Sequence, residues 1–231
     1  MNRSAELAQS LAAVEERLQA ACAAVGRPRA EVQLVAVSKT RPASDVAALY
    51  ALGVRDVGEN RDQEARPKAD ELRGLDLHWH FVGSVQSNKA DSIAAYVDVV
   101  HSVDRPTLVR ALSRAAGRAE RRLDVLLQVS LDGDPERGGA AEGALNRLAE
   151  QVEESEGLRL AGVMAVAPLD QDPQAAFEAL SDISGRLRRD HPQARQISAG
   201  MSGDLEPAIR SGSTIVRVGT ALFGSRPPVL R

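Results

Sequence analysis

Apolar residues follow one spacing up to about residue 26 and a different spacing after it. In the first segment they recur at steps of three and four, which predicts an amphipathic helix over residues 1–26. After Gly26-Arg27-Pro28, short β-branched runs alternate with longer stretches rich in Ala, Leu, Glu and Arg, which favour helix. The apolar positions of the first helix are Leu7, Leu11, Val14, Leu18, Cys22 and Val25.

The second segment contains eight predicted strands with predicted helices between them. The strands cover residues 33–38, 54–59, 77–83, 98–103, 124–131, 158–166, 196–199 and 214–223. The helices cover residues 43–52, 62–72, 87–96, 105–120, 140–154, 174–190 and 205–210. Apolar runs such as LVAV and VLLQV are typical of strands that are buried on both faces. Strict alternation of strands and helices predicts a parallel sheet.

Eight strands are the number that closes a barrel, which favours a barrel over an open doubly wound sheet. We therefore predict the α/β class and one (β/α)8 TIM barrel domain over residues 1–231. Residues 1–26 add an N-terminal helix, and residues 225–231 form a short tail. Because a barrel leaves no free sheet edge, we expect a monomer.

Composition excludes several classes of protein. The formal net charge of −3 and an aromatic content of 3% argue against a nucleic-acid partner. The single cysteine, Cys22, permits no intramolecular disulfide and fits inert packing in a reducing compartment. The N-terminus lacks the apolar core of a signal peptide, and no run of about 18 apolar residues occurs. We expect a soluble, cytoplasmic protein with no membrane partner.

The chemistry of such a barrel lies at the C-terminal ends of its strands. Lys39 follows the apolar run LVAV at the end of the first predicted strand. Burial disfavours the ammonium form, so an amine at this position is a usable imine-forming nucleophile. A lysine that merely escapes into a surface loop is the alternative, and position alone does not decide between them.

Two glycine-containing segments lie near the end of the chain. GMSGD follows the seventh predicted strand, and VGT lies within the eighth. Their small residues would let backbone N–H groups approach an anion, and Ser202 and Thr220 add hydroxyl donors. A helix that begins near Asp204 would point its positive end at the same spot. Barrels often bind phosphate with these two loops, so we favour a phosphate site over ordinary turn glycines.

Arg217 interrupts the apolar strand TIVRVGTALFG, and a buried arginine needs an acceptor. That acceptor is either a structural carboxylate or a heteroatom of a ligand in the barrel mouth. His80, His101 and Asp104 lack the spacing of a metal site, so packing or support of neighbouring residues is favoured for them.

Five motifs in order, from about residue 30 to residue 226, resemble the pyridoxal phosphate (PLP) homeostasis proteins, an alanine racemase N-terminal-domain-like family. The motifs are AVSKTRP, GENRDQEARPK, HWHFVGSVQSNK, SAGMSGD and RVGTALFG. The resemblance implies the barrel of fold-type III PLP proteins, with PLP held as an imine on Lys39. It also implies the other contacts: Ser202, Gly219 and Thr220 at the phosphate with help from Met201 and Ser198, Arg217 at the pyridine nitrogen, and Asn60 beside the ring.

An arginine at the pyridine nitrogen keeps that nitrogen unprotonated, which weakens the ring as an electron sink. A fold-type III racemase also draws a tyrosine base from a C-terminal β-domain. The chain ends soon after the eighth strand, and its tyrosines, Tyr50 and Tyr96, fall on predicted helices. We therefore expect a non-catalytic PLP-binding protein of PLP (vitamin B6) and amino-acid homeostasis, with apo PLP-dependent enzymes as recipients.

Two alternatives belong to other classes. One is a PLP enzyme such as an amino-acid racemase, which needs a base that the sequence does not supply. The other is a phosphate-substrate barrel enzyme in which Lys39 forms imines with sugar phosphates.

Overall fold

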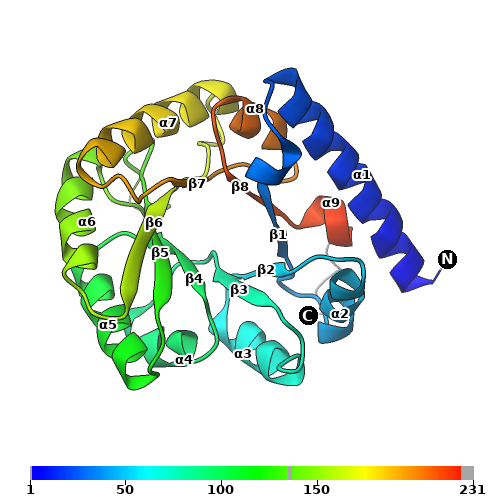
Figure 1. Ribbon diagram of the computed structural model, residues 1–231, viewed down its shortest axis with the longest axis horizontal. Coiled ribbons are helices and arrows are strands. Elements are labelled where there is room, and N and C mark those ends of the chain that lie inside the picture. Colours follow the sequence, from blue (N-terminus) through cyan, green and yellow to red (C-terminus); the bar gives the residue numbers. More distant parts are fainter. Residues whose placement is uncertain (1, 135–136, 225–231) are drawn as a thin grey trace.

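Eight parallel strands close into a ring in the computed structural model, which describes residues 2–134 and 137–224. Each strand pairs with the next in the chain, and the last pairs with the first, so Val35 lies beside Arg217. Helices surround the ring on its outside (Figure 1). The predicted (β/α)8 barrel is confirmed.

The strands are β1 Gln33–Val37, β2 Asp56–Glu59, β3 His78–Phe81, β4 Val99–Val103, β5 Leu123–Gln128, β6 Leu158–Met164, β7 Gln196–Ser198 and β8 Ile215–Val218. The helices are α1 Arg3–Ala24, α2 Ala43–Ala51, α3 Asp62–Glu71, α4 Ala90–Ala94, α5 Pro106–Arg118, α6 Leu145–Glu153, α7 Pro173–Asp190, α8 Leu205–Arg210 and α9 Thr220–Phe223. Short 3₁₀ turns, Arg29–Glu31, Ser87–Lys89 and Glu142–Ala144, precede β1, α4 and α6.

The N-terminal helix lies on the outside of the barrel against α2, α8 and α9 (Figure 1). Leu7, Val14, Leu18 and Cys22 form its buried stripe and join an apolar cluster with residues of β1, β8 and α8. The predicted helix and the packing role of Cys22 are therefore confirmed.

One prediction about secondary structure is wrong in a way that matters for the site. The strand expected over residues 214–223 ends at Val218, and Thr220–Phe223 forms a helical turn instead. The amide of Phe223 donates to the carbonyl of Gly219, which closes this turn. The apolar run continues because Leu222 and Phe223 pack under α1, so apolar character did not require a strand here.

Other boundaries differ by a few residues. The fifth and sixth strands end at Gln128 and Met164, and the helices expected to begin at 87 and 140 begin at Ala90 and Leu145 after 3₁₀ turns. The predicted tail, residues 225–231, lies outside the described residues. No helix within residues 2–134 and 137–224 is long and apolar enough to cross a membrane.

Candidate functional site

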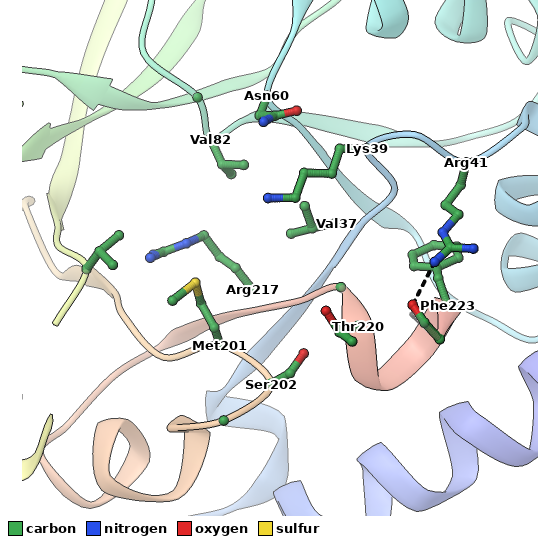
Figure 2. A pocket seen from close by; sticks show the side chains of 15 residues that line it. Val37, Lys39, Arg41, Asn60, Val82, Met201, Ser202, Arg217, Thr220 and Phe223 are labelled. Atoms are coloured by element: carbon green, nitrogen blue, oxygen red, sulfur yellow. Dashed lines mark hydrogen bonds between the residues drawn. The ribbon is translucent and has the colours of Figure 1, made fainter. Parts of the chain in front are cut away.

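A cavity of about 420 Å³ opens at the C-terminal ends of β1 and β8, where barrels carry their chemistry. Its size is within the range of small-molecule sites. Side chains from β1, β2, β8 and the loop after β7 meet in it (Figure 2). Seven residues singled out in the sequence line it: Lys39, Asn60, Met201, Ser202, Arg217, Gly219 and Thr220.

Lys39 lies directly after β1, and its amine points across the cavity in the direction of Arg217 (Figure 2). The next residue, Thr40, has a φ of 64°, a left-handed conformation that is costly for a β-branched side chain. Its N–H donates to Glu64 Oε2 at 2.9 Å, which ties the turn to α3. The backbone that carries Lys39 is therefore held in a defined turn and is not a free surface loop.

A buried polar cluster lies beneath this turn. Lys68 Nζ donates to the Ser38 carbonyl at 2.9 Å and pairs with Glu59, and the Ser38 hydroxyl donates to Glu59 Oε1 at 2.5 Å. Burial raises the pKa of Glu59, although Lys68 and Ser38 act in the opposite direction. The cluster joins the C-terminal ends of β1 and β2 to α3, and so fixes the base of the Lys39 turn.

The sequence analysis missed Lys68 as part of the site. Its position on α3 carried the signal, because Ala65, Lys68 and Ala69 share one buried face at steps of three and four. A lysine on such a face requires a buried acceptor, and the carboxylate of Glu59 at the end of β2 provides one.

The loops after β7 and β8 form the other side of the cavity. The hydroxyl of Ser202 accepts the N–H of Ala221 at 3.2 Å, so the two loops contact each other directly. Gly200 has a φ of 89°, and a Cβ there would lie 2.6 Å from that of Ala208. Only glycine allows the loop to turn this close to α8. The hydroxyls of Ser202 and Thr220 lie on the same side of the cavity (Figure 2).

The N-terminal helix supports this side from outside. Arg17 donates to the Ser202 carbonyl at 3.0 Å and pairs with Glu206 at 2.7 Å. Arg3 donates to the Phe223 carbonyl at 3.1 Å, at the end of α9. Thus α1 contacts both loops, a role that its apolar stripe did not predict.

Arg217 lies at the floor of the cavity and is almost fully buried. Its Nη1 donates to Ser198 Oγ at 2.6 Å, and its Nη2 donates to the Ala165 carbonyl at 3.0 Å. No carboxylate among the described residues lies within ion-pair distance of it. Burial lowers the pKa of Arg217 to about 10, with Asp204 acting in the opposite direction, so it remains a cation at neutral pH.

Ser198 does not line the cavity, unlike the other seven residues. It is fully buried beneath Arg217, and its hydroxyl also contacts His101 Nδ1 at 2.9 Å. His80 and His101 are buried and contact each other, whereas Asp104 pairs with Arg105. In the described ranges, no three His, Cys, Asp or Glu side chains gather as a metal site would require.

The lining is strongly asymmetric in charge. Lys39, Arg41 and Arg217 contribute three cations, and none of the described lining residues is acidic. An anion is therefore favoured in this cavity. The lining also contains no tyrosine: Tyr50 stacks under Arg55, and Tyr96 contacts Asp62.

The site fits an anionic, aldehyde-bearing cofactor of the size of PLP. A primary amine, a buried cation and two hydroxyls converge on one cavity, and the loops that carry the hydroxyls are joined by the hydrogen bond from the Ala221 N–H to the Ser202 hydroxyl. These are the groups that would hold an aldehyde, a ring nitrogen and a phosphate.

The sequence model of a family described as "Alanine racemase, N-terminal domain" matches residues 9–227. Alanine racemase of Corynebacterium glutamicum has a TM-score of 0.68 to this chain at 15% identity, covering 96% of this chain and 63% of that one. At that identity the likeness shows the fold alone. The class defined by fold and site is that of alanine racemase-like barrels.

Nearer relatives narrow this class. The "Pyridoxal phosphate homeostasis protein" of Mycobacterium tuberculosis is 49% identical over 244 residues, which cover 97% of this chain and 95% of that protein. The protein of the same name from Escherichia coli is 37% identical over 227 residues, with coverage of 96% and 97%. This chain belongs to the family of pyridoxal phosphate homeostasis proteins.

This chain is also similar to a protein whose structure has been solved with its ligand. PipY of Synechococcus elongatus, in a structure with PLP bound, has a TM-score of 0.84 at 37% identity. The match covers 94% of this chain and the whole of that one.

Proposed function

We propose that this protein binds PLP in the cavity at the ends of β1 and β8, covalently through Lys39, and serves PLP and amino-acid homeostasis. The observation that carries the proposal is the convergence of the Lys39 amine with Arg217, Ser202 and Thr220 in a cavity whose described lining residues include no carboxylate. The PLP bound to PipY and the names of the curated relatives support it.

When bound, PLP supplies an aldehyde that condenses with a primary amine. In our proposal, Lys39 supplies that amine from a turn fixed by Glu64 and by the cluster beneath it. Ser202 and Thr220 donate their hydroxyls to the phosphate, and the backbone of Met201 and Gly219 approaches it. Asn60 borders the ring, and Arg217 faces the ring nitrogen as a permanent donor, which keeps that nitrogen unprotonated. Ser198 acts only through Arg217.

The chain contains only three lysines, so an experiment can establish which of them binds PLP. Besides Lys39 they are Lys68, which is buried in an ion pair, and Lys89, which lies in the turn Ser87–Lys89 and is not among the described residues that line the cavity. We expect the purified protein to turn yellow with PLP, and borohydride to fix the cofactor on Lys39 alone. Lys39→Ala should abolish both signals and Lys89→Ala should preserve them. A colourless wild-type protein, or an adduct on Lys89, would refute the proposal.

We propose further that the protein is a carrier without robust catalytic activity. Racemisation of a bound amino acid needs a second base on the face opposite the lysine. Among the described lining residues there is no tyrosine, histidine, cysteine or carboxylate to serve as one. Solvent deuterium uptake with inversion at Cα of assorted amino acids should therefore stay close to that of free PLP. Rapid exchange with inversion would favour a racemase instead.

A further inference from the structure

A continuous line of hydrogen bonds crosses the interior of the barrel from the cavity to the opposite end. Arg217 Nη1 contacts Ser198 Oγ at 2.6 Å, and Ser198 Oγ contacts His101 Nδ1 at 2.9 Å. His101 Nε2 contacts His80 Nδ1 at 2.9 Å, and His80 Nε2 contacts Asp56 Oδ1 at 3.0 Å. We name this set the lumen chain: Arg217, Ser198, His101, His80 and Asp56.

The lumen chain joins strands that are not neighbours. Ser198 lies on β7 and His101 on β4, so their contact spans the lumen. Apart from Asp56, whose side chain is 17% exposed, its members are almost completely buried. Asp56 lines a second cavity of about 460 Å³ at the N-terminal end of the barrel, together with His78 and Gln33. The chain thus connects the two ends of the barrel.

The two ends of the lumen chain restrict the direction in which its hydrogen bonds run. Arginine can only donate, and an ionised carboxylate can only accept. One assignment satisfies every contact with neutral histidines: Ser198 accepts from Arg217 and donates to His101 Nδ1, His101 donates from Nε2 to His80 Nδ1, and His80 donates from Nε2 to Asp56. Both histidines then carry their proton on Nε2. The reverse direction would require a cationic His80 and a Ser198 hydroxyl that accepts from both neighbours.

Charges around the chain agree with this direction. Burial would raise the pKa of Asp56, but contacts with His80, His78 and Gln33 lower it, so the carboxylate is ionised. Burial lowers the pKa of His101 well below its usual value, and the neighbouring Arg217 cation acts in the same direction. Burial lowers the pKa of Arg217, and the charge of Asp204, which is not a member of the lumen chain, acts in the opposite direction.

We propose that the lumen chain is a positioning device for the cofactor site: it holds the Arg217 guanidinium charged and in one orientation at the cavity floor. Every donor in the chain points away from Arg217 and every acceptor points toward it, so the aligned dipoles stabilise the cation. Asp56 serves as its counter-ion from the far end. Arg217 therefore needs no adjacent carboxylate, which would compete with a ligand for its remaining N–H groups. The part of this proposal that concerns the cofactor rests on the proposed function.

The first test does not depend on PLP. ¹⁵N NMR at pH 7.5 on the protein without added cofactor reports the tautomer of each of the four histidines, assigned through single variants. We expect His80 and His101 to be neutral and protonated on Nε2. A cationic His80, or a His101 protonated on Nδ1, would overturn the proposed direction of the chain.

The second test asks whether the chain acts on the bound cofactor. Ser198→Ala removes the first link, and Ser213→Ala is its matched control, since Ser213 is equally buried but bonds only to backbone carbonyls. In Ser198→Ala we expect the pH midpoint of the visible band of bound PLP to move by about one pH unit. The control should titrate like the wild type. Identical midpoints in both variants would overturn the positioning role.

Asp56→Asn provides a variant that keeps a hydrogen-bond acceptor at the exposed end and removes only the charge. Because Asp56 lies at the rim, this variant tests the chain even if Ser198→Ala does not fold. We expect a midpoint shift in the same direction, and an unchanged midpoint would again count against the chain. If the wild-type protein shows no visible band at all, the proposed function fails, while the NMR result still decides the chain.

Discussion

Two buried cations, Lys68 and Arg217, lie beneath the same cavity and are neutralised in different ways. Lys68 contacts the carboxylate of Glu59 directly, within a closed cluster under the Lys39 turn. The Arg217 guanidinium contacts only neutral acceptors, the Ser198 hydroxyl and the Ala165 carbonyl, and in our proposal its counter-ion is Asp56 at the far end of the lumen chain. A cation paired by contact is a structural element, whereas a cation paired at a distance keeps donors for a ligand.

The largest effect should come from breaking the direct pair. Lys68→Met leaves Glu59 buried without its partner, and we expect the free energy of unfolding to fall by about 3–5 kcal/mol. Guanidinium denaturation measures this loss, with Lys89→Met as the control for removal of a lysine. The double variant Lys68→Met/Glu59→Gln should recover part of it. A single variant as stable as the double one would show that Glu59 carries no charge.

We expect a smaller loss in the free energy of unfolding when Arg217 is replaced. Arg217→Met leaves the Ser198 hydroxyl and the Ala165 carbonyl without a donor, but it strands no adjacent charge. Unmet hydrogen bonds of this kind cost about 1–3 kcal/mol in stability. The same denaturation experiment compares the two variants. A loss that equals or exceeds that of Lys68→Met would break the distinction between direct and distant pairing.

The lumen chain should also impart a pH dependence to stability. The pKa of His101 is depressed in the folded state. Near pH 6.5, His101 therefore takes up a proton in the unfolded chain but stays neutral in the folded protein. The contribution of neutral His101 to the free energy of unfolding is complete above that pH and is lost as the pH falls. The slope is up to about 1.4 kcal/mol per pH unit. His101→Asn should lose this slope between pH 6.5 and 5, whereas His191→Asn should keep it. Parallel curves for wild type and His101→Asn would contradict the expectation.

The smallest effect is expected at the outer support of the cavity. Arg17 is about one-third exposed in its pair with Glu206, so Arg17→Ala should cost only about 0.2–1 kcal/mol in stability. PLP retention, measured by dialysis, should decline modestly, because the Ser202 carbonyl loses a donor. Arg118→Ala removes an exposed ion pair between α5 and Asp91 of α4 and should leave PLP retention unchanged. Equal retention in both variants would show that α1 does not support the loop.

The order of strands and helices could be predicted from the sequence because each element has its own spacing of apolar residues. That order, with eight strands, was enough to predict the barrel. The candidate site residues could also be predicted, because a parallel barrel brings all strand ends to one face. Lys39, Ser202, Arg217 and Thr220 do line one cavity.

Hydrophobicity alone could not separate strand from helix in a short apolar run. Thr220–Phe223 satisfies either structure, and packing of Leu222 and Phe223 under α1 selected the helical turn. The residues that hold the site in place from outside the cavity could not be predicted either. Arg17 and Lys68 resemble ordinary helix residues until their distant partners, Ser202 and Glu59, are known.

By itself the sequence determined the barrel, the lysine at the end of β1 and the glycine loops after β7 and β8, since these follow from local spacing and residue type. It required that Arg217 have an acceptor, but offered only a carboxylate or a ligand. The tertiary structure added neutral protein acceptors, the Ser198 hydroxyl and the Ala165 carbonyl, and placed Ser198 in contact with His101 across the lumen. Such partners lie 97 residues apart, and only closure of the barrel brings their side chains together.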